Sequence, residues 1–299
     1  MLFTLHTFFM ATLREIRRRI RSVKNIRQIT KALQAVSASR VRRAQESATA
    51  TRPYTAKARD LLASVASLAG GETRHPLLTK RDEVKNVTIV LISADRGLAG
   101  AFNSNVGRIA FNFGREQTAP VSYVTYGKKG RDFVFRRGGN VIADYSPIPA
   151  RPVLLDTTPI TRQVIEDFLE GKTDEVWLAY TDYVSAAIQK PTLKKLLPLA
   201  AEELLEGTKS DGPRPAYDFE PDPQGILDTL LPRLTEMQVY QAVLESLASE
   251  HTARMVAMRN ATDNASDLIL SLTLTYNKAR QQAITSELLD IAGGTEALK

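Results

Sequence analysis

Two long amphipathic stretches lie at opposite ends of this chain, over residues 13–68 and 223–292, and they constrain its fold more than any other feature. In the first stretch apolar side chains recur at steps of three and four, which is typical of one face of a coiled-coil helix. At a rise of about 1.5 Å per residue, the two helices would be roughly 85 and 105 Å long. Neither can bury its apolar stripe alone, so we expect the two stretches to pair. The predicted seam of the first stretch is Leu13, Ile16, Ile20, Val23, Ile26, Ile29, Leu33 and Val36.

The second stretch repeats the same spacing and then changes character. Its seam is predicted at Leu227, Leu230, Leu234, Met237, Tyr240, Leu244 and Leu247, after which alanines recur at nearly every fourth position. Proline and glycine set the expected limits of both helices. Pro53 should kink or interrupt the first helix and Gly70-Gly71 should stop it, whereas Pro223 should begin the second. Pro232 should bend the second helix, and Gly293-Gly294 should end it.

The residues between the two stretches alternate between strand-like and helix-like patterns. The run NVTIVLIS (86–93) has the length and β-branched content of a strand buried on both faces. Further strands are predicted over 120–127, 140–145 and 174–184, and helices over 102–113, 130–137 and 158–169. This alternation favours an α/β domain with a mostly parallel sheet. The predicted fold class is therefore a long antiparallel α-helical coiled coil, formed by the N- and C-terminal helices, with an inserted α/β domain.

The predicted domains follow from these patterns. We assign residues 10–70 to the N-terminal coiled-coil helix, 71–221 to the inserted α/β domain with its connectors, and 222–299 to the C-terminal coiled-coil helix. Residues 1–9 are apolar and precede Met10, but they lack the basic leader and cleavage site of a secretory signal. We interpret them as an extension or a mis-assigned start, with a targeting segment as the alternative.

Composition excludes several classes of function. The chain has no cysteine, which rules out disulfides, thiolate catalysis and cysteine-ligated zinc. Its three histidines are too scattered to indicate a metal cluster, and no Ser/His/Asp arrangement is recognisable. No run of about 18 apolar residues is present for crossing a bilayer. We therefore expect a non-catalytic protein with no cofactor, no metal and no membrane span.

The positive charge is concentrated in the first helix. The chain carries a net charge of +7, and fourteen Lys or Arg residues lie between Arg14 and Arg59 against only Glu15 and Glu46. Such a segment could be a solvated helix face or could bind an acidic partner. Nucleic acid is one such partner, but Tyr54 is the only aromatic residue of the segment for base stacking or readout. An acidic protein surface fits equally well.

Two further segments invite a functional interpretation. The turn SADRGLAGAFN (93–103) follows a buried strand, where open α/β sheets bind phosphates, but it lacks both common phosphate-binding glycine motifs. The structural alternative is a tight turn made by Gly97 and Gly100, with Asp95 and Arg96 bonding locally. Near the C-terminus, Arg280, Gln281, Thr285 and Glu287 form a polar face that suggests hydrogen bonding to another protein.

Several segments together resemble the gamma subunit of F-type ATP synthases. They are REIRRRIRSVKNIRQITKALQAVSASRVRRAQ and SADRGLAGAFN in the first half of the chain, and EPDPQGILDTLL, QVYQAVLESLASEHTARMVAMRNATDN and YNKARQQAITSEL in the second. The resemblance runs from Met10 to Ala297, with the segments in the same order and at similar spacing.

The resemblance implies a central-stalk rotor that couples proton flow to ATP synthesis or hydrolysis at beta-subunit sites and regulates the ATPase. The implied partners are a ring of three alpha and three beta subunits, the epsilon subunit and a ring of c subunits, with no nucleic acid. The implied location is peripheral, on the cytoplasmic face of the bacterial cell membrane, as part of F1. Contacts to the ring are implied at Leu33, Arg254, Arg280, Gln281, Thr285 and Glu287, and a contact to epsilon at Tyr217.

Two rival hypotheses remain from the residues alone. A DNA-associated coiled coil would use the basic helix to neutralise phosphates, and its affinity would fall steeply with salt. A nucleotide-dependent enzyme would use the middle α/β region, and the isolated chain would then bind ATP or a dinucleotide.

Overall fold

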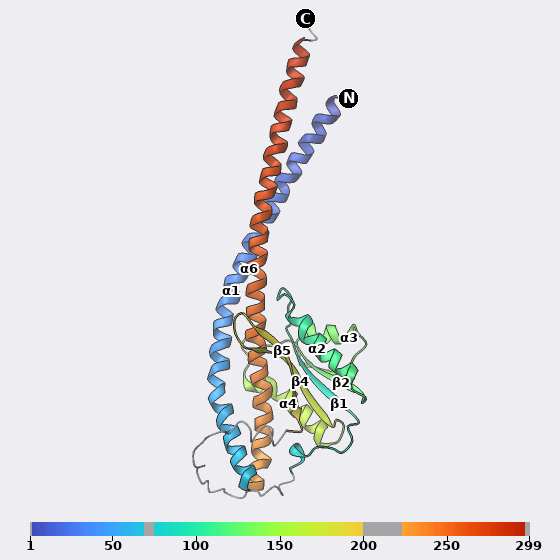
Figure 1. Cartoon of the computed structure of the whole chain (residues 1–299), viewed down its shortest axis with the longest axis vertical. Coiled ribbons are helices and arrows are strands. Elements are labelled where there is room, and N and C mark those ends of the chain that lie inside the picture. Colours follow the sequence, from blue (N-terminus) through green and yellow to red (C-terminus); the bar gives the residue numbers. More distant parts are fainter. Residues whose placement is uncertain (1, 69–74, 200–222, 297–299) are drawn as a thin grey trace. The chain divides into compact units, whose positions relative to one another are not determined.

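The computed structural model describes residues 2–68, 75–199 and 223–296, which form two compact units. One unit combines Met1–Ser37 with Met255–Lys299, and the other is Ala38–Arg254. Two long helices, α1 (Leu2–Leu68) and α6 (Pro223–Glu296), contribute residues to both units (Figure 1). We describe each unit by itself. No helix in the described ranges is both long enough and apolar enough to cross a membrane.

The two long helices are less interrupted than the sequence predicts. α1 continues through Pro53 for another fifteen residues, so of the predicted kink or interruption at Pro53 the interruption is wrong. α6 likewise continues through Pro232, and it passes Gly293-Gly294 before it ends at Glu296. The glycine pair therefore does not end the helix. An isolated proline or glycine lowers helix stability without forbidding a helix that other contacts support.

The unit Ala38–Arg254 contains a five-stranded sheet in the order β3-β2-β1-β4-β5. The parallel strands are β1 (Val87–Ile92), β2 (Val121–Tyr126), β3 (Asn140–Asp144) and β4 (Glu175–Tyr183). The edge strand β5 (Gln189–Leu197) runs antiparallel to β4. All six residues of the central strand β1 are buried, as its unbroken apolar sequence predicts. The prediction of a mostly parallel α/β sheet is thus confirmed.

Helices cover both faces of this sheet. On one face α2 (Phe102–Glu116) and α3 (Lys128–Phe135) pack through Val106, Ala110 and Val134 against alternate residues of β1 and β2. On the other face α4 (Leu154–Leu169) and the first part of α6 share one hydrophobic core with the sheet. A short 3₁₀ helix, η1 (Pro76–Leu78), packs against this second core through the buried Leu77. The two cores hold the loops that follow β1 and β2 in fixed positions.

Within the same unit, α1 also pairs with α6 and with the sheet. Val41, Ala44 and Ala48 are buried at steps of three and four. The amide of Gln45 donates a hydrogen bond to the hydroxyl of Tyr183 in β4. Because α6 is covered on several sides here, its buried residues extend well beyond the single predicted seam. Leu231, Val239 and Ala242 are all at most 3% exposed.

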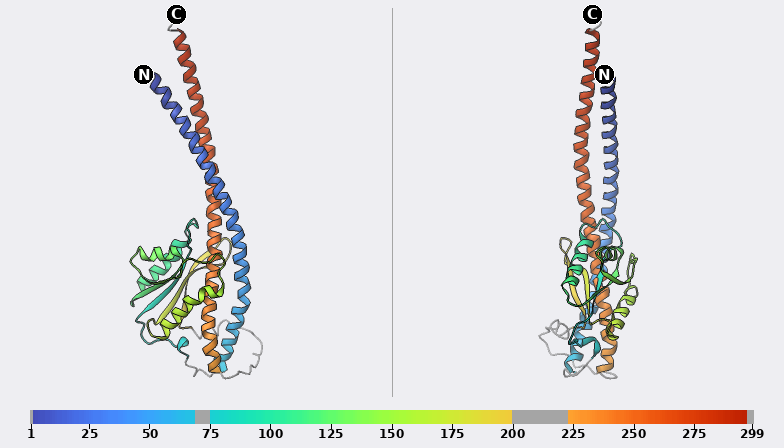
Figure 2. Two further views of the ribbon diagram at one scale, coloured as in Figure 1. Left: turned by 180° about the vertical axis from the view of Figure 1, so that it is seen from behind. Right: turned by 90° about the vertical axis from the view of Figure 1, so that its right-hand side faces the viewer.

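In the other unit, the two helix ends form what we call the terminal helix pair, residues 13–37 of α1 and 255–296 of α6. The two segments lie side by side around Thr30, whose hydroxyl is 2.7 Å from that of Thr262 (Figures 1 and 2). Farther along, Arg17 donates a 2.6 Å hydrogen bond to the hydroxyl of Tyr276, and its guanidinium carbon lies 5.4 Å from the ring centroid. Contact between the N- and C-terminal helices is therefore confirmed.

The seam predicted for α1 is only partly right. Leu13, Ile16, Ile20 and Val23 are half-buried, as expected. After Val23, however, the buried heptad positions are Thr30 and Ser37, at 8% and 2% exposure, whereas Ile29 and Val36 are 59% and 49% exposed. Each of these two apolar residues lies one position before a buried one and so points about 100° away around the helix. Small hydroxyl residues line the contact and leave an apolar stripe uncovered.

Candidate partner-binding surfaces

The loop after β1 makes the turn that the sequence predicts, with Gly100 as expected but with Leu98 in place of Gly97. The residues with positive φ are Leu98 at 62° and Gly100 at 56°, whereas Gly97 has no left-handed conformation. Leu98 is a large apolar residue, 66% exposed, in a conformation that costs a residue with a Cβ roughly 1 kcal/mol or more. Leu98 was not among the predicted contact residues, although its place between two glycines in a polar loop is a usable signal. We regard Leu98 as a candidate contact residue.

Asp95 was predicted to bond locally, but this prediction is wrong. Its carboxylate instead joins the loops that follow three strands. Its Oδ1 accepts a 3.0 Å hydrogen bond from the backbone N–H of Lys128, and its Oδ2 accepts one of 2.7 Å from that of Ile148. These partners are 33 and 53 residues away in the chain. The carboxylate thus fixes the loop edge of the sheet.

The first amides of α3 are already occupied by acceptors from this same loop. The N–H of Lys128 donates to Asp95, that of Lys129 to the carbonyl of Ala94 at 2.9 Å, and that of Gly130 to Oγ of Ser93 at 2.7 Å. A bound phosphate would need such amides at a helix N-terminus. Their use inside the fold disfavours a nucleotide at the β1–β2 edge, which was one rival hypothesis.

Arg254 lies in the unit Ala38–Arg254, and its side chain is only 11% exposed. Its guanidinium forms a 2.7 Å ion pair with Glu250, whose side chain is also 11% exposed. It donates from Nε and one terminal nitrogen to the carbonyl of Gly97, at 3.3 and 3.2 Å. Its other terminal nitrogen lies 3.3 Å from Nδ1 of His251. Arg254 therefore fastens α6 to the loop that carries Leu98.

Burial governs the titration of the residues beside Arg254. Burial raises the pKa of Glu250, and the positive charge of Arg254 opposes this rise. Burial also lowers the pKa of His251 to about 4, with help from the charges of Arg254 and Arg40. The imidazole is therefore neutral near pH 7, and its Nδ1 is available to accept a hydrogen bond from Arg254.

The far end of α6 presents the other predicted contact residues to solvent. Arg280, Gln281, Thr285 and Glu287 are all exposed, and from Ile284 to Thr295 every residue is exposed. The hydroxyl of Thr285 donates to the carbonyl of Gln281 at 2.9 Å, within the helix. Large apolar residues share this surface, with Ile284 49%, Leu288 62% and Ile291 61% exposed. A surface that mixes exposed apolar groups with polar ones is typical of a contact region.

The remaining predicted residues are separate from this cluster. Leu33 is half-buried on α1, where its carbonyl accepts a 2.7 Å hydrogen bond from Ser37. Tyr217 lies outside the described residues. The structure thus groups Arg280, Gln281, Thr285 and Glu287 on one helix end.

The positive charge of α1 is exposed wherever its side chains are described. The two acidic residues of the segment form ion pairs within the helix, Glu15 with Arg19 at 2.6 Å and Glu46 with Arg42 at 3.0 Å. Arg14, Arg18 and Arg21 are exposed on the part of α1 that belongs to the terminal helix pair. This surface suits an acidic partner.

Comparisons with known proteins match this chain to ATP synthase over nearly its whole length. A protein-family model described as ATP synthase matches residues 12–298. The chain is 48% identical to the ATP synthase gamma chain of Dehalococcoides mccartyi strain 195 over 290 residues, which cover 97% of this chain and 100% of that protein. The gamma chain of Herpetosiphon aurantiacus is 46% identical, with 97% of this chain and 99% of that protein covered.

Solved structures share the fold at lower sequence identity. The rotor of the Euglena gracilis mitochondrial ATP synthase matches with a TM-score of 0.66 and 22% identity, over 92% of this chain and 99% of that one. A chain of the central stalk and c-ring of the Tetrahymena thermophila mitochondrial enzyme matches with a TM-score of 0.58 and 24% identity, over 78% and 99%. The chain therefore belongs to the family of ATP synthase gamma chains, the non-catalytic subunits that form the rotor of the central stalk.

Proposed function

We propose that this chain couples proton flow through a membrane ring of c subunits to ATP synthesis or hydrolysis at beta-subunit sites, and that it regulates the ATPase. The terminal helix pair turns inside a ring of three alpha and three beta subunits. The main support is the exposed end of α6, where large apolar residues and polar residues alternate without cover from the rest of the described chain. Such a surface needs a partner to remove it from water.

The coupling works because the helix pair is asymmetric. A protein that contacts three identical subunits can shift the equilibrium between their conformations only if its contact free energy differs between those conformations. α1 offers arginines and an apolar stripe at Ile29 and Val36, whereas the end of α6 offers Arg280, Glu287 and uncharged apolar residues. Each beta subunit would therefore meet a different face at any one moment.

The proposed contacts to the ring are Leu33, Arg280, Gln281, Thr285 and Glu287, together with Arg254. For Arg254 the contact is limited to its exposed edge, since its guanidinium is engaged with Glu250 and Gly97. Its larger contribution is to hold Leu98 in place for a partner. The basic residues of α1 face acidic loops of the ring.

We also propose two further partners and a location for the chain. The epsilon subunit contacts the region of Tyr217, and the c-ring lies beneath the α/β domain. The complex is peripheral on the cytoplasmic face of the bacterial cell membrane, as part of F1. Support comes from the match to chains of a rotor and of a central stalk with its c-ring in two mitochondrial enzymes.

Shortening α6 tests the coupling. An ATP synthase whose gamma chain ends after Ala265 should lose most proton-driven ATP synthesis in sealed vesicles, because the exposed end of α6 is gone. Unimpaired synthesis by this truncated complex would refute the proposal. The control is the amount of assembled complex, measured by quantitative immunoblot.

A charge reversal tests the proposed contacts more finely. Arg280→Glu should lower ATP synthesis more than Lys278→Glu, which makes the same charge change two residues away on another face of the helix. Equal activity of the two variants would count against a specific contact at Arg280.

A further inference from the structure

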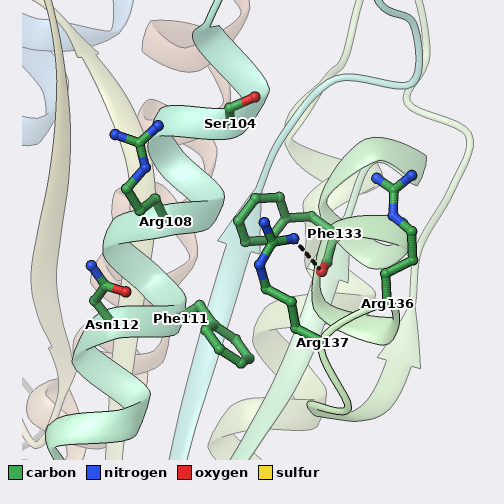
Figure 3. Close-up of a pocket in the computed structure, with 7 residues that line it drawn as sticks. All are labelled: Ser104, Arg108, Phe111, Asn112, Phe133, Arg136 and Arg137. Atoms are coloured by element: carbon green, nitrogen blue, oxygen red, sulfur yellow. Dashed lines mark hydrogen bonds between the residues drawn. The ribbon is translucent and has the colours of Figure 1, made fainter.

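A basic groove lies between α2 and α3 on the outer face of the sheet, separate from the terminal helix pair. It encloses about 690 Å³. Its lining contains three arginines and no carboxylate: Ser104, Arg108, Phe111, Asn112, Phe133, Arg136 and Arg137. In Figure 3, one face of α2 carries the first four of these residues and α3 with its C-terminal end carries the other three.

The floor of the groove is apolar and closely packed. A Cβ on Gly107 of α2 would lie 2.8 Å from two ring carbons of Phe133, so only glycine lets this ring approach the helix so closely. Phe111 is half-buried on the same side of α2. Because Phe133 packs on Gly107, the ring of Phe111 is the apolar surface that the groove offers to an occupant.

Two of the arginines are held in place by the C-terminal end of α3. Nε of Arg136 donates to the carbonyl of Asp132 at 3.0 Å, and a terminal nitrogen of Arg137 donates to the carbonyl of Phe133 at 3.2 Å. The guanidinium of Arg137 also lies 3.6 Å from the centroid of the Phe133 ring. Held in this way, the guanidinium loses less conformational entropy when it binds an anion.

The positive charge of the groove is not cancelled by its neighbours. Asp132 and Asp144, the carboxylates beside α3, both pair with Arg131, at 2.9 and 3.1 Å. Within the described ranges, Arg108, Arg136 and Arg137 form no ion pair with the chain's own carboxylates. Capping of α3 explains the positions of Arg136 and Arg137 but not that of Arg108 on the opposite wall.

We propose that the α2–α3 groove binds an acidic segment of a partner protein, with its carboxylates on Arg108 and Arg137 and an apolar side chain against Phe111. Arginine pairs well with carboxylates, and arginine and aromatic residues are enriched at protein interfaces. A nucleotide fits less well, since the first amides of α3, which could bind a phosphate, are occupied within the fold. This inference goes beyond the proposed function, because it does not involve the terminal helix pair.

Binding of a defined probe by the full-length chain tests the proposal. The probe is a fluorescein-labelled seven-residue peptide of alternating glutamate and leucine, measured by fluorescence anisotropy at low salt. Arg108→Glu and Arg137→Glu should each weaken binding at least tenfold. Arg115→Glu should change it less than twofold, because Arg115 is exposed on the same helix but does not line the groove. Circular dichroism checks that each variant folds.

The outcomes separate the possible occupants. Loss of peptide binding in both groove variants, with retention in Arg115→Glu, supports a protein segment. Equal binding by all variants shows attraction to net charge alone and overturns the proposal, as does absence of binding by the parent chain. Tighter binding of ATP or of phosphatidylglycerol vesicles than of the peptide, lost in Arg137→Glu, would overturn it in favour of a phosphate ligand.

Discussion

Replacing Arg254 by methionine should destabilise the unit Ala38–Arg254 by about 3 kcal/mol at pH 8. Both partners of the Arg254–Glu250 ion pair are 11% exposed. Removing one partner of a buried pair costs about 3–5 kcal/mol, because the other charge is left without compensation. The slight exposure of this pair places the loss at the lower end of that range. The carbonyl of Gly97 also loses its donors, which is included in the estimate.

A second variant separates the charge effect from the lost hydrogen bonds. In Glu250→Gln/Arg254→Met no buried charge remains, so the loss should fall to about 1 kcal/mol, the usual value of the missing bonds to Gly97. The double variant should therefore be about 2 kcal/mol more stable than Arg254→Met alone. Urea unfolding followed through Trp177, the only tryptophan, reports on this unit.

The stability of Arg254→Met should also depend on pH, because Glu250 is left without its partner. Burial already raises the pKa of Glu250, and Arg254 is the main group that opposes this rise. Without Arg254 the folded-state pKa rises further above the unfolded value, so the penalty is greatest at high pH and shrinks as pH falls through the folded-state pKa. If Arg254→Met and the double variant are equally stable at pH 8, the reasoning from the buried charge is wrong.

Three further predictions concern residues of the same unit. Burial lowers the folded-state pKa of His251 to about 4, so the parent chain should lose up to about 1.4 kcal/mol of stability per pH unit as the pH falls from 6.5 towards 4. A plot of the urea midpoint against pH should have a shallower slope for His251→Asn. Gly107→Ala should lower the unfolding free energy by about 1 kcal/mol despite its better helix propensity, because its Cβ would overlap the ring of Phe133; a stabilised variant would contradict this. Asp95→Asn should cost about 1–3 kcal/mol, since its amide group would face a backbone N–H, and hydrogen exchange at Ile148 should rise at least tenfold.

Local sequence patterns predicted the four parallel strands of the α/β domain well, but they did not predict the antiparallel edge strand β5. β1 occupies 87–92 within the predicted 86–93, because a continuous run of β-branched residues has few alternatives to a buried strand. The seam of α1 was predicted less well. There the apolar residues Ile29 and Val36 form a convincing stripe, but the buried positions are Thr30 and Ser37. Periodicity identifies a stripe without saying which stripe faces the chain itself and which faces a partner.

Long-range hydrogen bonds between side chains and the backbone could not be predicted from the sequence, although the pairing of the two long helices could. Arg254 was predicted as a contact to another protein, whereas most of its guanidinium is used on Glu250 and on the carbonyl of Gly97, 157 residues away. A backbone carbonyl leaves no mark in the sequence, so no residue pattern points to this bond. The same holds for Asp95, whose partners are the amides of Lys128 and Ile148. For exposed residues such as Arg280, no contact within the described ranges competes with a partner, and their assignment to a partner stays a prediction.

The exposed apolar residues of α6 also indicate what kind of surface covers them. At about 100° per residue, Leu268, Leu270, Leu274, Ile284, Leu289 and Ile291 together span more than half of the helix circumference. A partner with a single flat face would cover one stripe and leave the others in water. A partner that surrounds the helix would cover all of them, and a helix that turns inside such a partner would keep them covered at every angle. The distribution of these side chains therefore supports a shaft within a ring rather than a helix docked in one groove.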